Sequence, residues 1–422
     1  MRASSGPRGL IAAHAAFMFH ETDEDTMRRS LCIFLLLLAL PAYPEGTLRD
    51  AVEHAWARQP AARAQPARAE EFVARRDAAG AAFPEPPSFS FSNRDDRFHR
   101  DEGARELEAA IALPLWLPGE QGRQTSIVNA ERNQYETGLT ATKLKIAGDV
   151  RDVYWQAHLA ENELVLARRK AQEAAVLAAD VERRVKAGDL ARVDLNQAQA
   201  AERLARAALT EAEIKAFRAR QAFAVLTGIS TLPAAEESSA PAGSALDDHP
   251  VLAPLQRAVV TTQAKLSQAT QSLRNNPELE LGLRRERGLS DEPYAHSFQM
   301  RFRLPFATDA RNKPRIAAAN AELIEAQAAY GIERAKVAAE IEAAQRELEQ
   351  SRTVVQLTEA RFTLAADTQR LLAKAFALGE LDLIARLRAE NERFEAELNF
   401  TRARHEAARA ISRLNQALGV LP

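Results

Sequence analysis

The chain has 422 residues and a formal net charge of −2, from 56 basic and 58 acidic side chains. This balance favours no polyanionic partner such as a nucleic acid. The single cysteine, Cys32, excludes a disulfide framework or a thiolate metal site within one chain. Aromatic residues make up 6% of the chain, which suits elongated helices better than a compact globule.

The first 42 residues divide into two segments. Residues 1–26 carry no targeting pattern and are interpreted as disordered or as an incorrectly assigned start, with Met27 as the true first residue. Residues 27–42 have the pattern of a secretory signal peptide, with an Arg-Arg pair, an apolar stretch at 31–40 and a small-residue cleavage site. That stretch is too short to span a membrane. Because Cys32 lies early within it, the mature chain is expected to have no lipid anchor and no cysteine.

A helix followed by two strands is predicted next. The helix covers residues 47–80, with Thr47 as its N-cap and Gln59-Pro60 as a point of interruption. The proline-rich segment 83–87 stops it. The apolar period then changes to two, so strands are predicted at 87–93 and 105–114. Each strand has about the length of a short strand of a membrane barrel.

The longest predicted element is a helix over residues 120–187, followed by a turn at Gly188 and a returning helix over 190–227. A helix of this length spans on the order of 100 Å. Two seven-residue ladders indicate the a and d positions of a left-handed coiled coil. The ladders are Leu139, Ile146, Val153, Ala160, Ala167, Ala174 and Val181, and Val150, Ala157, Leu164, Ala171, Ala178 and Val185.

The whole pattern occurs twice. Gly188 recurs as Gly379, and the offset is 379 − 188 = 191 residues; Leu113-Pro114 recurs as Leu304-Pro305 at the same offset. The chain is therefore predicted to contain two copies of one unit, at 47–228 and 249–422, joined by a linker at 229–248. The second copy repeats the order of the first, with a helix at 250–273, strands at 277–285 and 296–305, a long helix at 312–378 and a helix at 381–418.

The predicted fold class is mainly α with β, with long antiparallel coiled-coil hairpins and four short strands. One face of each strand is apolar and the other is polar or charged, which suits a barrel with lipid outside and water inside. Four strands cannot close a membrane barrel, because eight is about the minimum, and open sheet edges are prohibitive in lipid. Three copies would supply twelve strands. Soluble strand pairs packed on helices are the alternative. The predicted lipid-facing residues are Phe89, Phe91, Leu107, Ile111, Leu281, Leu283, Phe298, Met300 and Phe302.

The signal peptide, the duplicated helix–strand–strand–long helix–helix unit and the two turns together resemble the TolC family of outer-membrane efflux proteins. The turns read RVKAGDLARVD at 184–194 and AFALGELDL at 375–383, and the resemblance covers nearly all of residues 44–422. It implies a homotrimer with a twelve-stranded outer-membrane barrel and a periplasmic helical tunnel. It further implies a periplasmic adaptor (membrane fusion) protein and an inner-membrane pump, of the RND type, as partners. The Gly-Glu-Leu turn favours the heavy-metal, CzcC-like branch.

By the same resemblance, the turns contact the adaptor and gate the tunnel. The implied tip residues are Gly188, Asp189, Leu190, Asp194, Gly379, Glu380, Leu381 and Asp382. Asp194 matches an acidic position that the archetype uses to hold its tip closed. The second copy departs from the archetype, because Ala385 and Arg388 stand where it has a ring of aspartates and Leu381 stands where it has a gating arginine. The archetype's gate network is therefore not expected here.

The acids of the second turn have two interpretations. Glu380 and Asp382 either supply a substitute acidic ring or are solvated turn residues. No catalytic or cofactor-binding motif is present, so the chain is not expected to be an enzyme. The basic strand residues Arg284, Arg301 and Arg303 are expected to face a lumen rather than a nucleic acid. No metal site is predicted, because the histidines lack ligand spacing and are interpreted as surface residues: His54, His99, His158, His249, His296 and His405.

These patterns predict a passive exit duct in the outer membrane, with most of the chain in the periplasm. Its cargo would be a heavy-metal cation, a drug or another small molecule, and its resting state open or closed. A periplasmic adaptor is one alternative, although adaptors normally carry one hairpin flanked by β-rich halves. A filamentous coiled-coil scaffold is the other, and the signal peptide and alternating strands oppose it.

Overall fold

The computed structural model describes residues 46–422, apart from residues 100, 235–236 and 241–245. The predicted signal peptide at 27–42 and the segment before it lie outside the described residues. The helices are α2 (Leu48–Arg58), α3 (Pro60–Ala79), α4 (Glu120–Ala187), α5 (Arg192–Thr227), α6 (Leu252–Gln271), α7 (Asp309–Ala377) and α8 (Leu383–Ala417), with a short 3₁₀ helix η1 (Leu246–Asp248). The strands are β1 (Ser88–Asp95), β2 (Arg105–Pro114), β3 (Glu278–Arg287) and β4 (Ala295–Arg303).

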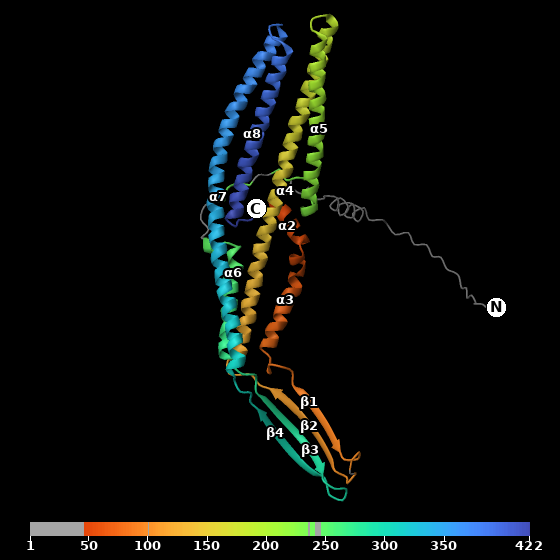
Figure 1. Cartoon of the computed structure of the whole chain (residues 1–422), viewed down its shortest axis with the longest axis vertical. Helices are drawn as coiled ribbons and strands as arrows, with labels where there is room; N and C mark the ends of the chain where they lie inside the picture. The colour runs from red at the N-terminus through yellow and green to blue at the C-terminus, as the bar shows by residue number, and fades with distance from the viewer. Residues whose placement is uncertain (1–45, 100, 235–236, 241–245) are drawn as a thin grey trace, which may run out of the picture. The chain divides into compact units, whose positions relative to one another are not determined.

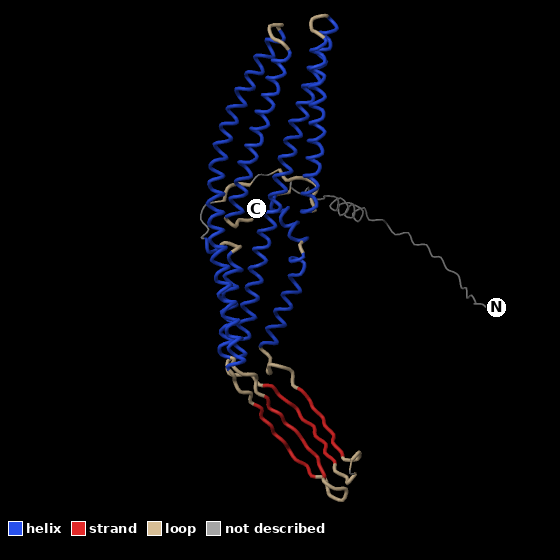
Figure 2. The backbone as a smooth tube through the Cα atoms, in the orientation of Figure 1, coloured by secondary structure: helices blue, strands red, loops and turns tan. Residues whose placement is uncertain are grey.

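This element order confirms the predicted fold class, mainly helical with one small antiparallel sheet. Within residues 46–422, the sheet lies at one end of the long helices and the α4–α5 and α7–α8 turns lie at the other (Figures 1 and 2). None of the helices that the structure describes combines the length and hydropathy needed to cross a bilayer.

The helix predicted over 47–80 is divided into two helices at Gln59-Pro60, the predicted point of interruption. Gln59 has an extended backbone, with φ −71° and ψ 141°, and separates α2 from α3. The physical cause is Pro60, which disfavours the helical conformation of the residue before it but is well suited to the first position of α3. At the start of α2, Thr47 and Asp50 form a reciprocal capping box.

Smaller differences concern the ends of elements. The second long helix, α7, begins at Asp309 rather than 312, which places Pro314 further inside it. Pro314 has no N–H to donate to the carbonyl of Ala310, yet the helix continues for many turns beyond it. The first strand extends to Asp95 instead of ending at 93.

The a and d ladder predicted for α4 lies along its packed side. Val150, Ala157 and Val181 are fully buried, and no member of either ladder is exposed. A representative layer contains Ala160 and Leu164 of α4 and Ala216 of α5. Small alanine side chains let the two helix axes approach closely, as in other antiparallel hairpins.

Charged residues join the two helical hairpins. Glu163 of α4 is paired with Lys215 of α5, its own hairpin partner, and with Arg402 of α8 at 2.7 Å. Burial raises the pKa of this carboxyl and the two cations lower it, and the net direction is downward. The carboxylate is therefore held in its charged form between the hairpins.

Midway along the helices, the linker and the C-terminal end of the chain fold onto α4. The guanidinium of Arg151, only 4% exposed, pairs with Glu237 of the linker at 2.7 Å and donates to the carbonyl of Val420 at 2.9 Å. Close by, Trp155 Nε1 donates to the hydroxyl of Ser412 of α8 at 2.8 Å. These contacts fix the two copies to each other far from the sheet.

The sheet order is β1-β2-β3-β4, and every neighbouring pair is antiparallel. The two copies meet at β2 and β3, where Ile111 is opposite Leu281. In the described chain, the outer edges of β1 and β4 have no strand partner. The sheet is therefore open at both sides.

Candidate functional site

One face of the sheet is apolar across all four strands. Residues directly opposite each other in an antiparallel ladder lie on the same face, so the register defines rows. One row is Phe89–Ile111–Leu281–Met300. The adjacent row is Phe91–Ala109–Leu283–Phe298, and a third joins Leu113, Leu279 and Phe302.

The predicted lipid-facing residues all belong to this apolar face. Most are open to solvent in the single chain: Phe89 is 70% exposed, Met300 69% and Leu283 67%. Large apolar side chains are not normally left this exposed in a contiguous group unless something covers them. The alternative of strand pairs packed on helices does not fit, because in the described chain no helix covers this face.

The opposite face is polar and holds internally paired charges. Glu106 lies 3.0 Å from Arg284 and 3.7 Å from Arg94, and Arg301 lies 2.9 Å from Glu280. These arginines come from strands β1, β3 and β4, so the ion pairs run across the sheet. Such a surface is compatible with water and unsuited to hydrocarbon.

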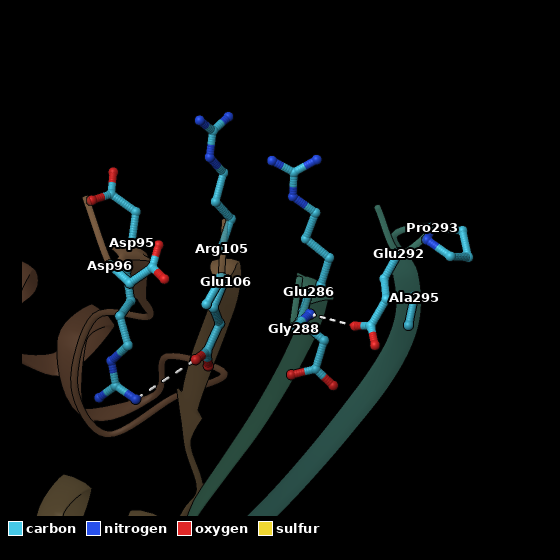
Figure 3. Close-up of a pocket in the computed structure, with 12 residues that line it drawn as sticks. Asp95, Asp96, Arg105, Glu106, Glu286, Gly288, Glu292, Pro293 and Ala295 are labelled. Atoms are coloured by element: carbon cyan, nitrogen blue, oxygen red, sulfur yellow. Dashed lines mark hydrogen bonds and ion pairs between the residues drawn. The ribbon is translucent and has the colours of Figure 1, made fainter. Parts of the chain in front are cut away.

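The loop end of the sheet has a different character from its centre. A hollow of about 460 Å³ lies there, lined by the ends of all four strands and the loop after β3. Figure 3 shows Arg105 directed to the opposite side of β2 from Glu106, as strand alternation requires. In the loop, Glu292 accepts hydrogen bonds from the backbone N–H groups of Gly288 and Leu289, at 3.0 and 3.1 Å.

At the other end of the molecule, both hairpin turns have one geometry. Gly188 and Gly379 adopt left-handed φ values of 88° and 77°. After each glycine, the next N–H bonds back across the turn, from Asp189 to the Arg184 carbonyl and from Glu380 to the Ala375 carbonyl, at 2.9 and 3.0 Å. This is the Schellman arrangement, which satisfies the last carbonyls of a helix and favours glycine.

The tip acids separate into two kinds. Asp194 accepts the N–H of Ala191 at 3.0 Å, and Asp382 accepts the N–H of Ala385 at 2.9 Å. Both cap the start of the returning helix, α5 or α8. The capping acid occupies a different position in each copy. It is the third residue of the helix in the first copy and the N-cap residue in the second. Ala385 stands at the position equivalent to Asp194, because the capping acid of the second copy is Asp382 instead.

The other two tip acids, Asp189 and Glu380, are exposed, and no side-chain partner is present within the described part of the chain. The leucines that follow them behave differently. Leu190 and Leu381 are partly buried against one apolar cluster that contains residues of both hairpins, including Val181 of α4 and Leu383 of α8. Apolar contacts therefore join the two hairpins at their tips.

Phe376 lies at the centre of this tip cluster, with 2% of its surface exposed. The guanidinium of Arg184, on the other hairpin, lies 5.2 Å from the ring centroid, and that of Arg386 lies 4.9 Å from it. Cations at these distances are attracted by the ring face. Sequence reasoning did not identify this contact. The repeat offered one signal, because a large aromatic residue, Phe376, stands where the first copy has Val185.

The histidines that the structure describes do not form a metal site. Among the residues that the structure describes, no group of three or more potential ligands lies close enough to hold an ion. The interpretation of His249 as a surface residue is wrong, because its side chain is buried against Gly419, with Nε2 3.1 Å from the Ala417 carbonyl oxygen. His158 is also partly buried, with Nε2 2.9 Å from the carbonyl oxygen of Pro233.

Comparisons with known proteins identify the fold. No protein-family model matches the sequence, and no curated protein matches it. Solved structures do match. CusC, studied for transmembrane channel formation, has a TM-score of 0.73 and 17% identity, covering 88% of this chain and 92% of that chain.

Two named outer-membrane proteins match almost as well. The CmeC outer membrane channel of Campylobacter jejuni has a TM-score of 0.71 and 15% identity, covering 88% of this chain and 85% of that chain. The outer membrane protein VceC of Vibrio cholerae has a TM-score of 0.71 and 16% identity, covering 88% of this chain and 96% of that chain. The chain therefore has the fold of these proteins over most of its length.

Proposed function

We propose that this protein is the outer-membrane channel of a tripartite efflux system, a passive exit duct with most of its chain in the periplasm. The observation that carries the proposal is the row register of the sheet. It puts exposed phenylalanine, leucine, isoleucine and methionine on one face and ion-paired arginine and glutamate on the other. The likeness of fold to outer-membrane channels supports the same reading.

The open edges of the sheet support a homotrimer. In hydrocarbon each unpaired backbone group costs several kcal/mol, so β1 and β4 need partners. Pairing β1 of one subunit with β4 of the next closes a barrel, and three subunits supply twelve strands. The same symmetry gathers the α4–α5 and α7–α8 hairpins into a tube.

The turns at Gly188 and Gly379 are the proposed contacts for a periplasmic adaptor protein, which would connect the duct to an inner-membrane pump of the RND type. We expect heavy-metal cations as the cargo, favoured by the Gly-Glu-Leu turn, with a drug or another small molecule as the alternative. An acidic ring at the tip would rest mainly on Glu380, because Asp382 is engaged as a helix cap. Unchanged conductance and cation selectivity in Glu380→Gln and Asp382→Asn channels would refute that ring.

The test of the duct is a cysteine scan of β3. The only cysteine, Cys32, lies in the predicted signal peptide, so each introduced thiol would be the sole one in the mature chain. Single cysteines at Leu279, Leu281 and Leu283 sample the apolar face, and those at Glu280 and Arg284 sample the polar face. In outer-membrane vesicles, a water-soluble maleimide should label the second set and spare the first.

Both sets should be labelled equally in detergent-free, urea-unfolded protein, which serves as the control for thiol reactivity. Single-channel recording and native mass spectrometry on the same preparation should give a conducting trimer. Labelling of Leu281→Cys as fast as Arg284→Cys in intact membranes would contradict the barrel. A periplasmic adaptor or a scaffold would fractionate without heat-modifiable outer-membrane behaviour and would show no conductance.

A further inference from the structure

At the loop end of the sheet, the apolar face gives way to arginine residues that have no carboxylate partner in the described chain. Along β2 and β3, the residues on this face change from leucine to arginine: Leu107 is followed by Arg105, and Leu283 by Arg285 and Arg287. The register confirms that they share a face, because Arg105 is opposite Arg287 and Leu107 is opposite Arg285. We call Arg105, Arg285 and Arg287 the arginine cluster.

The arginine cluster differs from the arginines on the polar face in one decisive respect. On the polar face, Arg94, Arg284 and Arg301 each have a carboxylate within 4.0 Å. In the part of the chain that the structure describes, no carboxylate lies within that distance of any arginine of the cluster. Three guanidinium groups on one side of the sheet are therefore left for an external anion.

The acidic residues nearby do not neutralise the cluster. Asp95 is opposite Arg105 in the ladder, but its carboxylate lies 3.9 Å from Arg97 instead. In the loops, Asp96 accepts the N–H of Glu102 at 2.9 Å and Glu292 accepts two backbone N–H groups. These carboxylates are engaged in holding the loops, so the positive charge of the cluster is not cancelled locally.

An aromatic ring orients two of the arginines. The guanidinium of Arg285 lies 4.0 Å from the centroid of the Tyr294 ring, and that of Arg287 lies 4.9 Å from it. Arg287 Nε also donates to the Gly103 carbonyl at 3.0 Å. Guanidinium groups held by a ring and a carbonyl keep other N–H donors free, and they lose less side-chain entropy when an anion binds. Tyrosine beside arginine is also typical of the boundary between hydrocarbon and headgroups.

We propose that the arginine cluster binds the phosphate groups of a lipid in the outer leaflet, which fixes the depth of the barrel in the membrane. This inference rests on the proposed function, because only a lipid-embedded sheet puts this face against a lipid. A phosphorylated lipid fits better than a soluble anion for one reason of geometry: the cluster is continuous with the apolar face, so a ligand there meets hydrocarbon and charge together. Planar guanidinium groups match phosphate oxygens in a bidentate manner.

The test uses the full-length oligomer in neutral detergent and diphosphorylated lipid A as the probe, with binding measured by native mass spectrometry. The Arg105→Gln, Arg285→Gln, Arg287→Gln triple variant should bind roughly 100-fold more weakly, at about fivefold for each arginine beside an anionic surface. The matched control removes three charges from the other face, with Arg94, Arg284 and Arg303 changed to Gln, and should stay within about twofold of the parent. Changing the cluster to lysine instead should restore much of the binding, because the charge is kept.

Each outcome decides the proposal. Equal loss of binding in both triple variants, or no loss in the cluster variant, would overturn it. If inorganic phosphate at the same concentration competes with lipid A, the ligand of the arginine cluster is a soluble anion and not a lipid, and the proposal fails. Single-channel recording of the same samples separates the two hypotheses: if the parent protein conducts and only the lipid result is negative, the duct stands and the arginine cluster does not bind lipid. If the parent does not conduct, the proposed function fails, while native mass spectrometry in detergent still tests whether the arginine cluster binds lipid A.

Discussion

Replacing Phe376 with alanine should loosen both helical hairpins at their tips, although the residue belongs to only one of them. The ring is 2% exposed and packs in a cluster with Leu177 and Val181 of the other hairpin. Truncating a buried phenylalanine costs about 3–5 kcal/mol. The two flanking arginines, Arg184 and Arg386, contribute about 0.5–1 kcal/mol each within that loss.

The assay is amide hydrogen exchange on the oligomer, followed at residues 177–198 of the first hairpin. A local loss of about 3 kcal/mol corresponds to more than a hundredfold lower protection, since 1.4 kcal/mol is tenfold. Phe362→Ala is the matched control, because that ring stacks on Phe400 within the second hairpin, with centroids 6.0 Å apart. Its effect should be confined to α7 and α8. The reasoning is refuted if Phe376→Ala leaves exchange at 177–198 unchanged while the second hairpin loosens.

Three further predictions concern the helical part. Glu237→Gln should lower the stability of the helical part by about 3 kcal/mol, because it leaves the buried Arg151 without a counter-charge. Glu53→Gln, at the exposed ion pair with Lys143, should cost under about 1 kcal/mol. Chemical denaturation followed by circular dichroism measures both. Burial lowers the pKa of His249 from its ordinary value of 6.5, so the folded state binds fewer protons than the unfolded state. Stability should therefore fall as the pH decreases below about 6.5, and the same measurement on His249→Gln should show a flatter profile. Gly379→Ala should cost about 1–2 kcal/mol from backbone strain alone, since nothing lies within 4 Å of an added Cβ, and Gly379→Asn should cost less.

The repeat explains how much of this fold could be predicted. An offset of 191 residues relates the two turns as copies of one unit. Period-two alternation identifies all four strands, because it depends only on local backbone geometry. The break at Gln59 has an equally local cause in Pro60. What local pattern does not encode is which long-range partner a side chain finds, so the Arg151–Glu237 pair, 86 residues apart, gave no signal in a polar linker.

The site shows the same limit. Strand parity was sufficient to group Phe89 with Met300, although they lie on different copies. Parity also assigned Arg284 to the polar side. It did not reveal that Arg284 is paired and its neighbour Arg285 is not, because that distinction requires the side chains of β2 and the loops to be placed. Asp194 and Asp382 looked alike as tip acids, and only the hydrogen bonds of the first helical turn identify them as caps.

The two long helices come from one repeat, yet they are buried to different extents, and this difference bears on assembly. Helix α4 packs against α5, α6 and α8, whereas α7 packs mainly against α6 and α8. One side of α7 consequently exposes leucines at an interval of seven residues, Leu357, Leu364 and Leu371, and Leu378 continues the interval just after the helix; each is at least 56% exposed. Exposed leucines at this interval have the pattern of a coiled-coil seam. In the proposed trimer, the rotation that joins β4 to a neighbouring β1 would also bring a neighbouring hairpin to this side of α7, so one assembly would cover both the unpaired strand edges and the exposed leucines.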